Sequence, residues 1–525
     1  MNFQGDGGRS NNGGVMISKI TTATIYGIDG IKIDVEVDIS IGLPAFNIVG
    51  LPETSVKESK ERVRSAIKNA GFEFPSDRIT INLAPADVRK EGSSFDLPIA
   101  VGILASLNMI KKDALRNCLF AGELSLDGRI KGVRGILPTA ILAGREGLSN
   151  LIVPHENGRE AAVVQGIRVL GAKHLLEIVH FLKGDGSLED FTGAGKNPDH
   201  DGKDWGLNFS DIRGQTQAKR ALEIAVSGSH NILLIGPPGS GKTMLARRIP
   251  TIMPPLSYDE AIETTKIHSI AGLLNASKFL VLDRPFRAPH HTISDAGLIG
   301  GGHVPRPGEV SLAHNGVLFL DEFPEFKRNA LEALRQPLED GDVTVSRVTH
   351  AITFPARFML VAAMNPCPCG YWGDTRRSCT CTGSQIHRYR SRISGPLLDR
   401  IDIHVEVPPV TIRELAMDRE EESSQAIRER VVEARKTQSE RFREKKIYAN
   451  GQMGARLIKK YCPLGEGGKE LLERAVEKFG LSPRAYHRII RVARTIADME
   501  GVDRIDGPHV AEAVQYRVLD KRMTL

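Results

Sequence analysis

The spacing of hydrophobic and polar positions divides the chain into segments of different character. In the first segment, apolar and polar residues alternate at positions 31–39 and 78–83, as in strands with one buried face. Positions 54–69 and 97–107 show helical spacing instead. Strands and helices mixed in this way predict an α/β or α+β domain over residues 16–182.

The remaining sequence changes character twice. Residues 183–203 are rich in Gly, Asp and Asn and are predicted to be a linker. Residues 204–409 alternate short apolar runs with helical patterns, which favours a parallel sheet flanked by helices. Residues 410–525 are almost entirely helical in pattern, with a strongly charged stretch at 427–445 and an arginine-rich one at 481–499. We therefore predict an α/β protein with an all-helical C-terminal domain.

Composition places the chain among ordinary globular proteins. Its 525 residues are 41% hydrophobic and 26% charged, a length that predicts roughly three domains. The longest apolar stretch, residues 97–110, is too short to span a bilayer. Residues 1–15 are rich in Gly and Asn and predict a disordered tail rather than a signal peptide. We expect a cytoplasmic protein with no membrane partner, and a net charge of +6 suits a polyanionic partner without requiring one.

A glycine-rich loop lies between the apolar run at residues 231–235 and a predicted helix that begins at Lys242. Such a loop turns successive backbone N–H groups towards the phosphates of a nucleotide. Lys242 would add a point charge for those phosphates, and the hydroxyl of Thr243 would bind Mg²⁺. The predicted ATP-binding residues are Gly236, Pro237, Pro238, Gly239, Ser240, Gly241, Lys242 and Thr243.

A second apolar strand, at residues 316–320, ends in the carboxylates Asp321 and Glu322. Asp321 would complete the Mg²⁺ shell, and Glu322 would polarise the attacking water. A glycine-rich turn or an acidic strand end has a simpler explanation when it occurs alone. The two motifs in this order predict an ATPase that uses ATP and Mg²⁺.

Four of the six cysteines are close together in the sequence, at Cys367, Cys369, Cys379 and Cys381. A disulfide framework is not expected in a cytoplasmic protein of this size. Two C-x-C pairs among glycines could instead surround one tetrahedral Zn²⁺, although the usual spacing is C-x₂₋₄-C. The alternative is a loop with reduced, unligated thiols.

Three further positions resemble functional residues of AAA+ ATPases. Asn365 ends the strand predicted at residues 358–365 and resembles sensor 1, which positions the attacking water. Arg400 resembles the arginine finger that reaches the γ-phosphate of a neighbouring subunit. The alternative for Arg400 is a surface ion pair with Asp399 or Asp402.

Arg484, at the start of an arginine-rich helix, resembles sensor 2, which reaches the bound nucleotide. Arg488, Arg491 and Arg494 lie near the same helical side and are alternatives for that role, or form a solvated face.

The segment between the two nucleotide motifs is longer than a minimal ATPase needs. Residues 286–308 resemble an insert in helix 2, and residues 343–354 predict a β-hairpin before Asn365. This pair of inserts resembles the magnesium-chelatase and MCM-helicase branch of AAA+ proteins. It implies loops that grip DNA, with Arg306 and Arg347 as candidate DNA contacts and ordinary surface charge as the alternative for each.

Other residues near these inserts are less informative. The basic residues at 385–390 are further candidate DNA contacts, and Arg347 also resembles a second trans-acting arginine of the chelatases. His290 and His291 have no third metal ligand indicated, so a hydrogen-bonded structural role is expected for them.

Five motifs carry a resemblance that extends from residue 17 to residue 522. They are GLPAFNIVGLP at 42–52, NLAPAD at 82–87, NPCPCG at 365–370, RISGPLLDRID at 392–402 and ARTIAD at 493–498. Together they resemble the YifB/ComM family of magnesium-chelatase-like ATPases. The resemblance implies a hexameric, ATP-driven ring that acts on single-stranded or branched DNA, and members of the family promote branch migration of DNA taken up during natural transformation.

The first domain resembles the proteolytic domain of Lon, with Ser94 at the position of Lon's nucleophile. Residues 122–137 match the segment that leads to Lon's catalytic lysine, but this chain has Leu137 there. A serine needs a nearby base, which leucine cannot provide, and Lys131 and Arg134 are out of register. The resemblance therefore implies a Lon-like scaffold rather than a protease.

Three hypotheses follow. The leading one is a motor that moves DNA and uses hydrolysis at each subunit interface. The second is a chelatase-type chaperone that remodels a protein partner for metal insertion, against which the fused Lon-like domain and the cysteine cluster argue. The third is an ATP-dependent protease, against which Leu137 argues.

Overall fold

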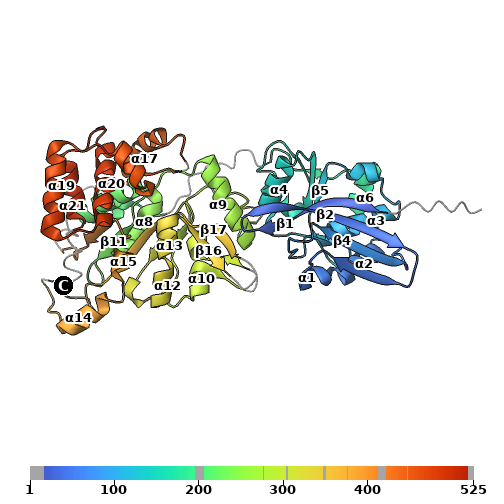
Figure 1. The fold of residues 1–525 in the computed structure, drawn as a ribbon, viewed down its shortest axis with the longest axis horizontal. Coiled ribbons are helices and arrows are strands. Elements are labelled where there is room, and N and C mark those ends of the chain that lie inside the picture. The colour runs from blue at the N-terminus through green and yellow to red at the C-terminus, as the bar shows by residue number, and fades with distance from the viewer. Residues whose placement is uncertain are drawn as a thin grey trace, which may run out of the picture. The chain divides into compact units, whose positions relative to one another are not determined.

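The computed structural model describes residues 17–194, 206–275, 277–302, 305–346, 351–374, 376–411, 421–445 and 447–517 (Figure 1). The predicted tail at residues 1–15 and residues 195–203 of the predicted linker lie outside these ranges. The described chain forms two compact units. The first contains residues 17–194 together with His268–Leu280, and the second contains residues 206–267 and 281–517.

The first unit is built on an eight-stranded mixed sheet in the order β10-β9-β8-β5-β1-β2-β4-β3. Neighbours β1, β2 and β4 are antiparallel, whereas β1, β5, β8 and β9 run parallel to one another. The strands are β1 (Ser18–Tyr26), β2 (Asp29–Ser40), β3 (Ala45–Val49), β4 (Arg78–Ala84), β5 (Cys118–Phe120), β8 (Asn150–Pro154), β9 (Arg168–Ala172) and β10 (Glu189–Asp190). The alternation at positions 31–39 and 78–83 therefore predicted two interior strands, β2 and β4, and the mixed α/β character is confirmed.

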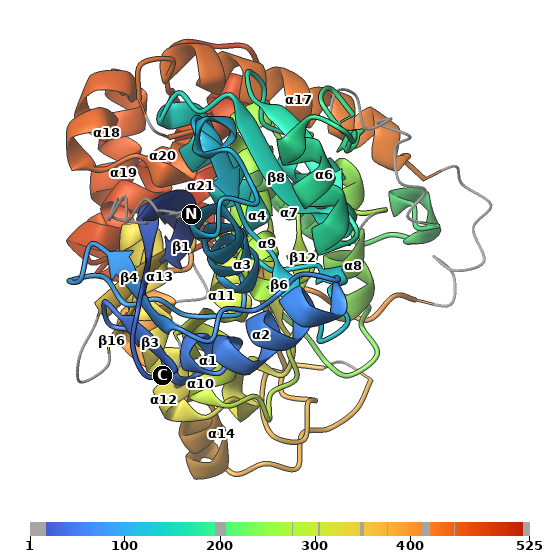
Figure 2. The same ribbon diagram turned by 90° about the vertical axis from the view of Figure 1, so that its right-hand side faces the viewer.

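Helices cover both faces of this sheet, and alternate residues of β1, β5, β8 and β9 face two different apolar cores. Ile152 of β8 belongs to one core, and its neighbours Leu151 and Val153 belong to the other. The first core lies under α2 (Ser59–Asn69), α3 (Asp96–Ser106) and α6 (Leu175–Lys183), and the second lies under α4 (Ile136–Arg145) and α5 (Gly158–Ala161). Of these elements, β8, α2, α3, α4 and α6 are labelled in Figure 2.

Two details of the first unit differ from the sequence pattern. The helix predicted at residues 54–69 is divided into α1 (Thr54–Lys57) and α2, because the hydroxyl of Ser59 donates to the carbonyl of Val56 at 2.6 Å and competes with the helical backbone. The segment His268–Leu280 also belongs to this unit, where Ser269 donates to the buried carboxylate of Glu160 at 2.5 Å. No sequence pattern predicted this return of the chain.

The second unit contains a five-stranded parallel sheet in the order β12-β15-β18-β11-β19. Its strands are β11 (Ile232–Ile235), β12 (Phe286–Arg287), β15 (Val317–Leu320), β18 (Met359–Met364) and β19 (Ile403–Glu406). In chain order β11 is the first strand of this sheet, and it lies between the sheet's fourth strand, β18, and its fifth, β19. The order of connections therefore reverses at β11, and ligands bind such sheets beyond the carboxyl ends of the strands at this point.

One apolar core joins this sheet to the C-terminal helices. It includes Ile232 and Leu234 of β11, Leu222 of α7, Val431 of α17 and Ile496 of α20. The helices are α7 (Thr216–Gly228), α8 (Lys242–Ile252), α17 (Ser424–Arg441), α18 (Ala455–Tyr461), α19 (Glu466–Phe479), α20 (Pro483–Met499) and α21 (Gly507–Gln515) (Figure 1). The predicted parallel sheet and the helical C-terminal region are thus confirmed.

Inserted elements extend this unit. The hairpin predicted at residues 343–354 consists of the antiparallel strands β16 (Asp342–Ser346) and β17 (Ala351–Pro355). The earlier insert contains α10 (Asp295–Ile299) and the short antiparallel strands β13 (Gly300–Gly301) and β14 (Arg306–Pro307). Among the described residues, no helix combines the length and the apolar character needed to cross a bilayer.

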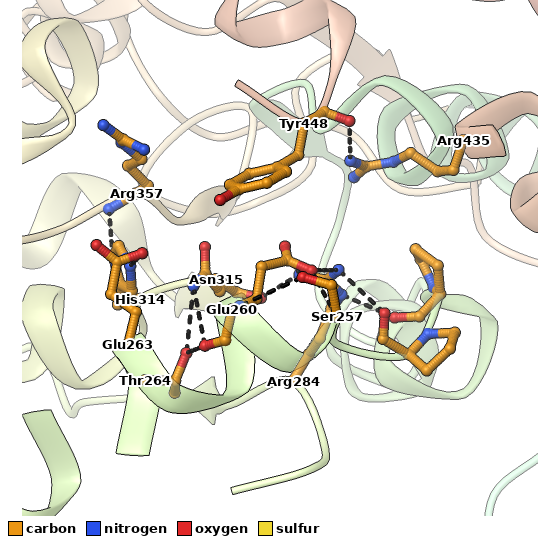
Figure 3. A network of polar contacts seen from close by, with 12 residues as sticks. Ser257, Glu260, Glu263, Thr264, Arg284, His314, Asn315, Arg357, Arg435 and Tyr448 are labelled. Carbon is orange, nitrogen blue, oxygen red and sulfur yellow. Dashed lines mark hydrogen bonds and ion pairs between the residues drawn. The ribbon is translucent and has the colours of Figure 1, made fainter. Parts of the chain in front are cut away.

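A buried polar network connects helix α9 (Tyr258–Ala271) with its surroundings in the second unit (Figure 3). Both carboxylate oxygens of Glu260 accept hydrogen bonds from Arg284 at 3.0 Å. On α17, Arg435 donates to the carbonyl oxygens of Val226 and Tyr448, and its burial lowers the pKa of the guanidinium to about 9. Because unpaired buried charges are costly, these partners fix how the C-terminal helices pack against the nucleotide-binding core.

His230 provides a test of this packing. Its side chain has no exposed surface, its Nε2 lies 2.8 Å from Thr495 Oγ1, and burial lowers its pKa from 6.5 to about 4. The charged groups around it are Asp402, Arg435, Arg488 and Arg491.

Between these pKa values the unfolded chain binds a proton that the folded chain does not, so the free energy of unfolding falls as the pH is lowered. We predict a loss of about 2 kcal/mol at the His230 site between pH 7 and pH 4.5. Urea unfolding at the two pH values measures this loss, and His230→Gln should reduce it. An unchanged pH dependence in that variant would contradict the assignment.

Candidate functional site

The glycine-rich loop follows β11 at the switch point of the sheet. The N–H of Gly236 donates to the carbonyl of Met364 at 3.2 Å, and a Cβ at this position would lie 2.2 Å from the carbonyl oxygen of Val407. Gly239 and Gly241 have φ values of +76° and +91°, which other residues rarely adopt. The loop leads directly into α8, so its N–H groups and the helix N-terminus form a site suited to phosphate.

The amino group of Lys242 lies at the centre of the site. Its Nζ donates to the carbonyl oxygens of Gly236 at 2.7 Å and Pro237 at 2.9 Å, and to Oδ1 of Asn365 at 3.1 Å. Burial lowers the pKa of Lys242 to about 8. Asn365 directly follows β18, the neighbour of β11, and the sheet therefore brings the lysine and the amide together. A nearby phosphate would stabilise the charged form of this lysine.

The second pair of residues on this edge offers oxygen ligands. The hydroxyl of Thr243, in the first turn of α8, donates to Oδ2 of Asp321 at 2.7 Å, and Asp321 directly follows β15. A hydroxyl and a carboxylate are ligand types that Mg²⁺ accepts alongside phosphate oxygens. The buried hydroxyl of Ser240 has no hydrogen-bond partner among the described residues. The residues present thus fit Mg²⁺ and the phosphates of ATP.

Glu322 has an unusual environment. Its φ of +52° places a non-glycine residue in the left-handed region, where strain often accompanies function. Its carboxylate lies 3.0 Å from Nδ1 of His291, whose ring packs against His290 at 4.1 Å between centroids. Sequence reasoning assigned the two histidines a structural role and missed this pairing, because no spacing rule connects the insert to the acidic strand end.

A cavity of about 480 Å³ adjoins the glycine-rich loop. Its lining includes apolar Ile212, Met244 and Leu245, together with polar Arg213 and Gln215. Mixed lining of this kind suits the base and ribose of a nucleotide whose phosphates lie on the loop.

Arg400 and Arg484 lie away from that cavity. Arg400 pairs with Glu339 at 2.7 Å, so the alternative ion pairs with Asp399 or Asp402 are not formed. Arg484 and Glu339 both line a second cavity of about 420 Å³. Among the described residues that line the loop cavity, neither arginine occurs.

The other arginines of α20 have structural partners. Arg488 pairs with Asp402 at 2.6 Å, and Asp402 also accepts from the backbone N–H of Asn231 at the start of β11. Arg494 is almost fully buried and pairs with Asp498 at 2.9 Å. Arg491 also lines the second cavity and lies 3.9 Å from Asp402.

The candidate DNA contacts differ in exposure. Arg306 is exposed on β14, and Arg347 lies outside the described residues. Within the basic run at residues 385–390, Arg390 is buried, with its guanidinium 4.2 Å from the ring centroid of Trp372. Arg390 is therefore not a surface charge, which corrects the expectation for that residue.

The four clustered cysteines converge, and their Sγ atoms all lie within 4.8 Å of one another. Cys367 lies 3.3 Å from Cys369 and 3.7 Å from Cys379, and Cys369 lies 3.5 Å from Cys379. Four thiolates around one Zn²⁺, with bonds of about 2.3 Å, have sulfurs about 3.8 Å apart. Within the described ranges, no other group of His, Cys, Asp or Glu side chains is arranged to hold a metal ion.

The position of Lon's catalytic lysine is apolar here. Leu137 is fully buried in α4, and its backbone N–H donates to Oε1 of Glu160 at 2.9 Å. Ser94 lies two residues before the start of α3, and its neighbour Ser93 donates to Glu123. No proton acceptor can come from residue 137 itself.

Comparison with known proteins matches nearly the whole chain. The family model "Magnesium chelatase, subunit ChlI" matches residues 208–415, "Subunit ChlI of Mg-chelatase" matches residues 35–157, and "Magnesium chelatase, subunit ChlI C-terminal" matches residues 421–517.

Three similar proteins differ in how much of the chain they match. Competence protein ComM of Haemophilus influenzae is 47% identical over 498 residues, which are 94% of this chain and 96% of that protein. The uncharacterized protein YifB of Escherichia coli is 45% identical over 509 residues, 96% of this chain and 98% of YifB. Lon protease 2 of Bacillus subtilis is 30% identical over 154 residues, 26% of each chain.

The full-length matches agree with the geometry of the nucleotide loop, the acidic strand end and the parallel sheet. The chain belongs to the YifB/ComM family of magnesium-chelatase-like AAA+ ATPases.

Proposed function

We propose that this protein is an ATP-driven motor that acts on DNA as a hexameric ring, with branch migration in homologous recombination and natural transformation as its task. The observation that carries the proposal is the convergence of Lys242, Asn365, Thr243 and Asp321 on one edge of the parallel sheet. The name of the Haemophilus relative, a competence protein, supports the assignment to DNA uptake. The proposed location is the cytoplasm.

In this mechanism the loop from Gly236 to Thr243 binds the phosphates, and Thr243 and Asp321 would hold Mg²⁺. The metal would neutralise charge that develops on the phosphate oxygens. Glu322 would accept a proton from the attacking water, and Asn365 would orient that water. These residues follow three adjacent strands of one sheet, β11, β18 and β15, which keeps their mutual geometry fixed.

Two arginines would act between subunits. Arg484 lines a cavity other than that of its own glycine-rich loop, and Arg400 pairs with Glu339, which lines the same cavity. This position suits contacts to the nucleotide of a neighbouring subunit in a ring. An arginine placed against the phosphate that is being transferred can raise the rate of hydrolysis by several orders of magnitude. The pair with Glu339 would then separate when the neighbour's ATP arrives.

The DNA contacts would come from the inserts. Arg306 is exposed on a short hairpin, and Arg347, which follows β16 in the sequence, lies outside the described residues and stays a candidate from the sequence. Backbone contacts of this kind are salt-sensitive and independent of sequence. The second candidate function is a chelatase-type chaperone for a protein partner, which the magnesium-chelatase family models favour.

The remaining parts would have supporting roles. Residues 16–182 would form a Lon-like scaffold without protease activity, since buried Leu137 occupies the lysine position. Residues 204–409 would form the ATPase core, and residues 410–525 the helical lid domain. The four cysteines, whose Sγ atoms all lie within 4.8 Å of one another, would bind one structural Zn²⁺.

His291 lies 3.0 Å from one carboxylate oxygen of Glu322, the proposed base. This contact should keep the carboxylate from accepting a proton from water. We predict that His291→Ala raises ATP turnover without DNA by about two- to fivefold, because the carboxylate becomes free to accept a proton. Phosphate release measures the effect, with the double variant His291→Ala/Glu322→Gln as the inactive control. A fall below the wild-type rate would show that His291 instead assists hydrolysis.

The motor proposal predicts that ATP turnover responds to DNA. We expect stimulation of at least about threefold, largest with a four-way junction, weaker with single strands and duplex, and lost as salt is raised. Glu322→Gln is the inactive control. If turnover responds to none of the three DNAs, the DNA motor is contradicted and the chaperone alternative gains support.

A further inference from the structure

The segment that carries the four cysteines contacts the glycine-rich loop. We call residues 366–382 the cysteine knuckle. Gly370 has a φ of +85°, and a Cβ there would lie 2.5 Å from Cδ of Pro238, a residue of the predicted ATP-binding loop. The two loops therefore touch, although more than a hundred residues of sequence lie between them.

The cysteine knuckle also contributes one wall of the loop cavity. Its cavity-lining residues are Tyr371, Asp374, Arg376 and Arg377. The guanidinium of Arg376 donates to the carbonyl oxygens of Pro409 at 3.3 Å and Val410 at 3.1 Å, which lie on the same cavity. Arg377 donates to the hydroxyl of Tyr371 at 2.9 Å, with its guanidinium 5.2 Å from the centre of that ring.

This wall has the chemistry of a nucleotide contact. An aromatic ring offers a stacking face for a base, and two arginines offer cations for a ribose-phosphate anion. The opposite side of the cavity is formed by Pro237, Gly239 and Gly241 of the glycine-rich loop.

Regular secondary structure does not hold this wall in place. The described residues of the knuckle between β18 and α14 (Gly383–Arg390) form no helix or strand. The fixed points are the stacking of Arg390 on Trp372 and the cysteine cluster, in which backbone N–H groups of Cys369, Trp372 and Cys381 donate to cysteine sulfurs at 3.3–3.4 Å. A metal ion bound by all four sulfurs would fix Tyr371 and the two arginines at once.

We infer that the zinc-loaded cysteine knuckle is part of the ATP site, where it places Tyr371 and Arg377 against the base and ribose of the nucleotide. Metal occupancy then sets the affinity for ATP. The inference rests on the proposed ATPase function and on the Zn²⁺ assignment, and it adds nucleotide-contact residues that lie outside the glycine-rich loop.

The test measures zinc content and the Kd for Mg·ATP on the same full-length samples. Cys379→Ser/Cys381→Ser should lose the zinc and weaken ATP binding by about tenfold. Arg377→Ala should keep the zinc and weaken ATP binding by at least about threefold. The matched control is Ser378→Ala, an exposed knuckle residue that does not line the cavity, and it should change neither quantity.

A second measurement separates the inference from misfolding of a cysteine variant. Wild-type protein is treated with a zinc-selective chelator in excess Mg²⁺ and then given Zn²⁺ again, and the affinity for ATP should fall and recover. An absence of zinc, or an ATP affinity that is unchanged by its removal, would overturn the inference. Phosphate release is recorded in parallel, because metal-dependent ATP binding without hydrolysis would contradict the proposed motor and leave the inference standing.

Discussion

The nucleotide site of the second unit depends on the hydrogen bonds of the buried amino group of Lys242. Its three hydrogen-bond partners are two backbone carbonyls and one side-chain amide, and none of them carries a full negative charge. A buried cation with only dipolar partners is costly, and this cost appears as a lowered pKa. A polyphosphate supplies the missing negative charge, so the fold keeps in place a site whose natural complement is an anion.

The parallel sheet brings the residues of this site together. Because β15, β18 and β11 are adjacent and parallel, the acidic end of β15, Asn365 and the glycine-rich loop all follow carboxyl ends of strands on the same edge of the sheet. The C-terminal helices share the apolar core of this sheet, and buried pairs such as Arg488 with Asp402 connect α20 to the base of β11. The C-terminal helices are therefore packed directly against the strand that precedes the nucleotide loop.

Much of this organisation is readable in the sequence, since it depends on local patterns. Alternation predicted β2 and β4, and apolar runs predicted β11, β15 and β18. The loop from Gly236 to Thr243, followed by the acidic end of β15, has the order of motifs that predicts an ATPase. The sequence did not predict the contact of His291 with Glu322 or the return of His268–Leu280 to the first unit. Both depend on tertiary contacts between segments that no periodicity connects.

Other differences arose where a side chain could serve either a surface or the interior. Arg390 belongs to a basic run, yet its guanidinium stacks on Trp372, and Arg400 pairs with Glu339 rather than with the acidic residues beside it in sequence. Sequence spacing identifies neighbours along one helix face, but it does not identify partners brought from another element.

The most direct test of the central claim is strand exchange at a labelled four-way junction, measured with wild-type protein and with Glu322→Gln. If hydrolysis at this sheet edge drives branch migration, wild-type protein with Mg·ATP should convert the junction to its two duplex products, and the variant should bind ATP without converting it. A wild-type protein that hydrolyses ATP in the presence of the junction and never moves its strands would contradict the account.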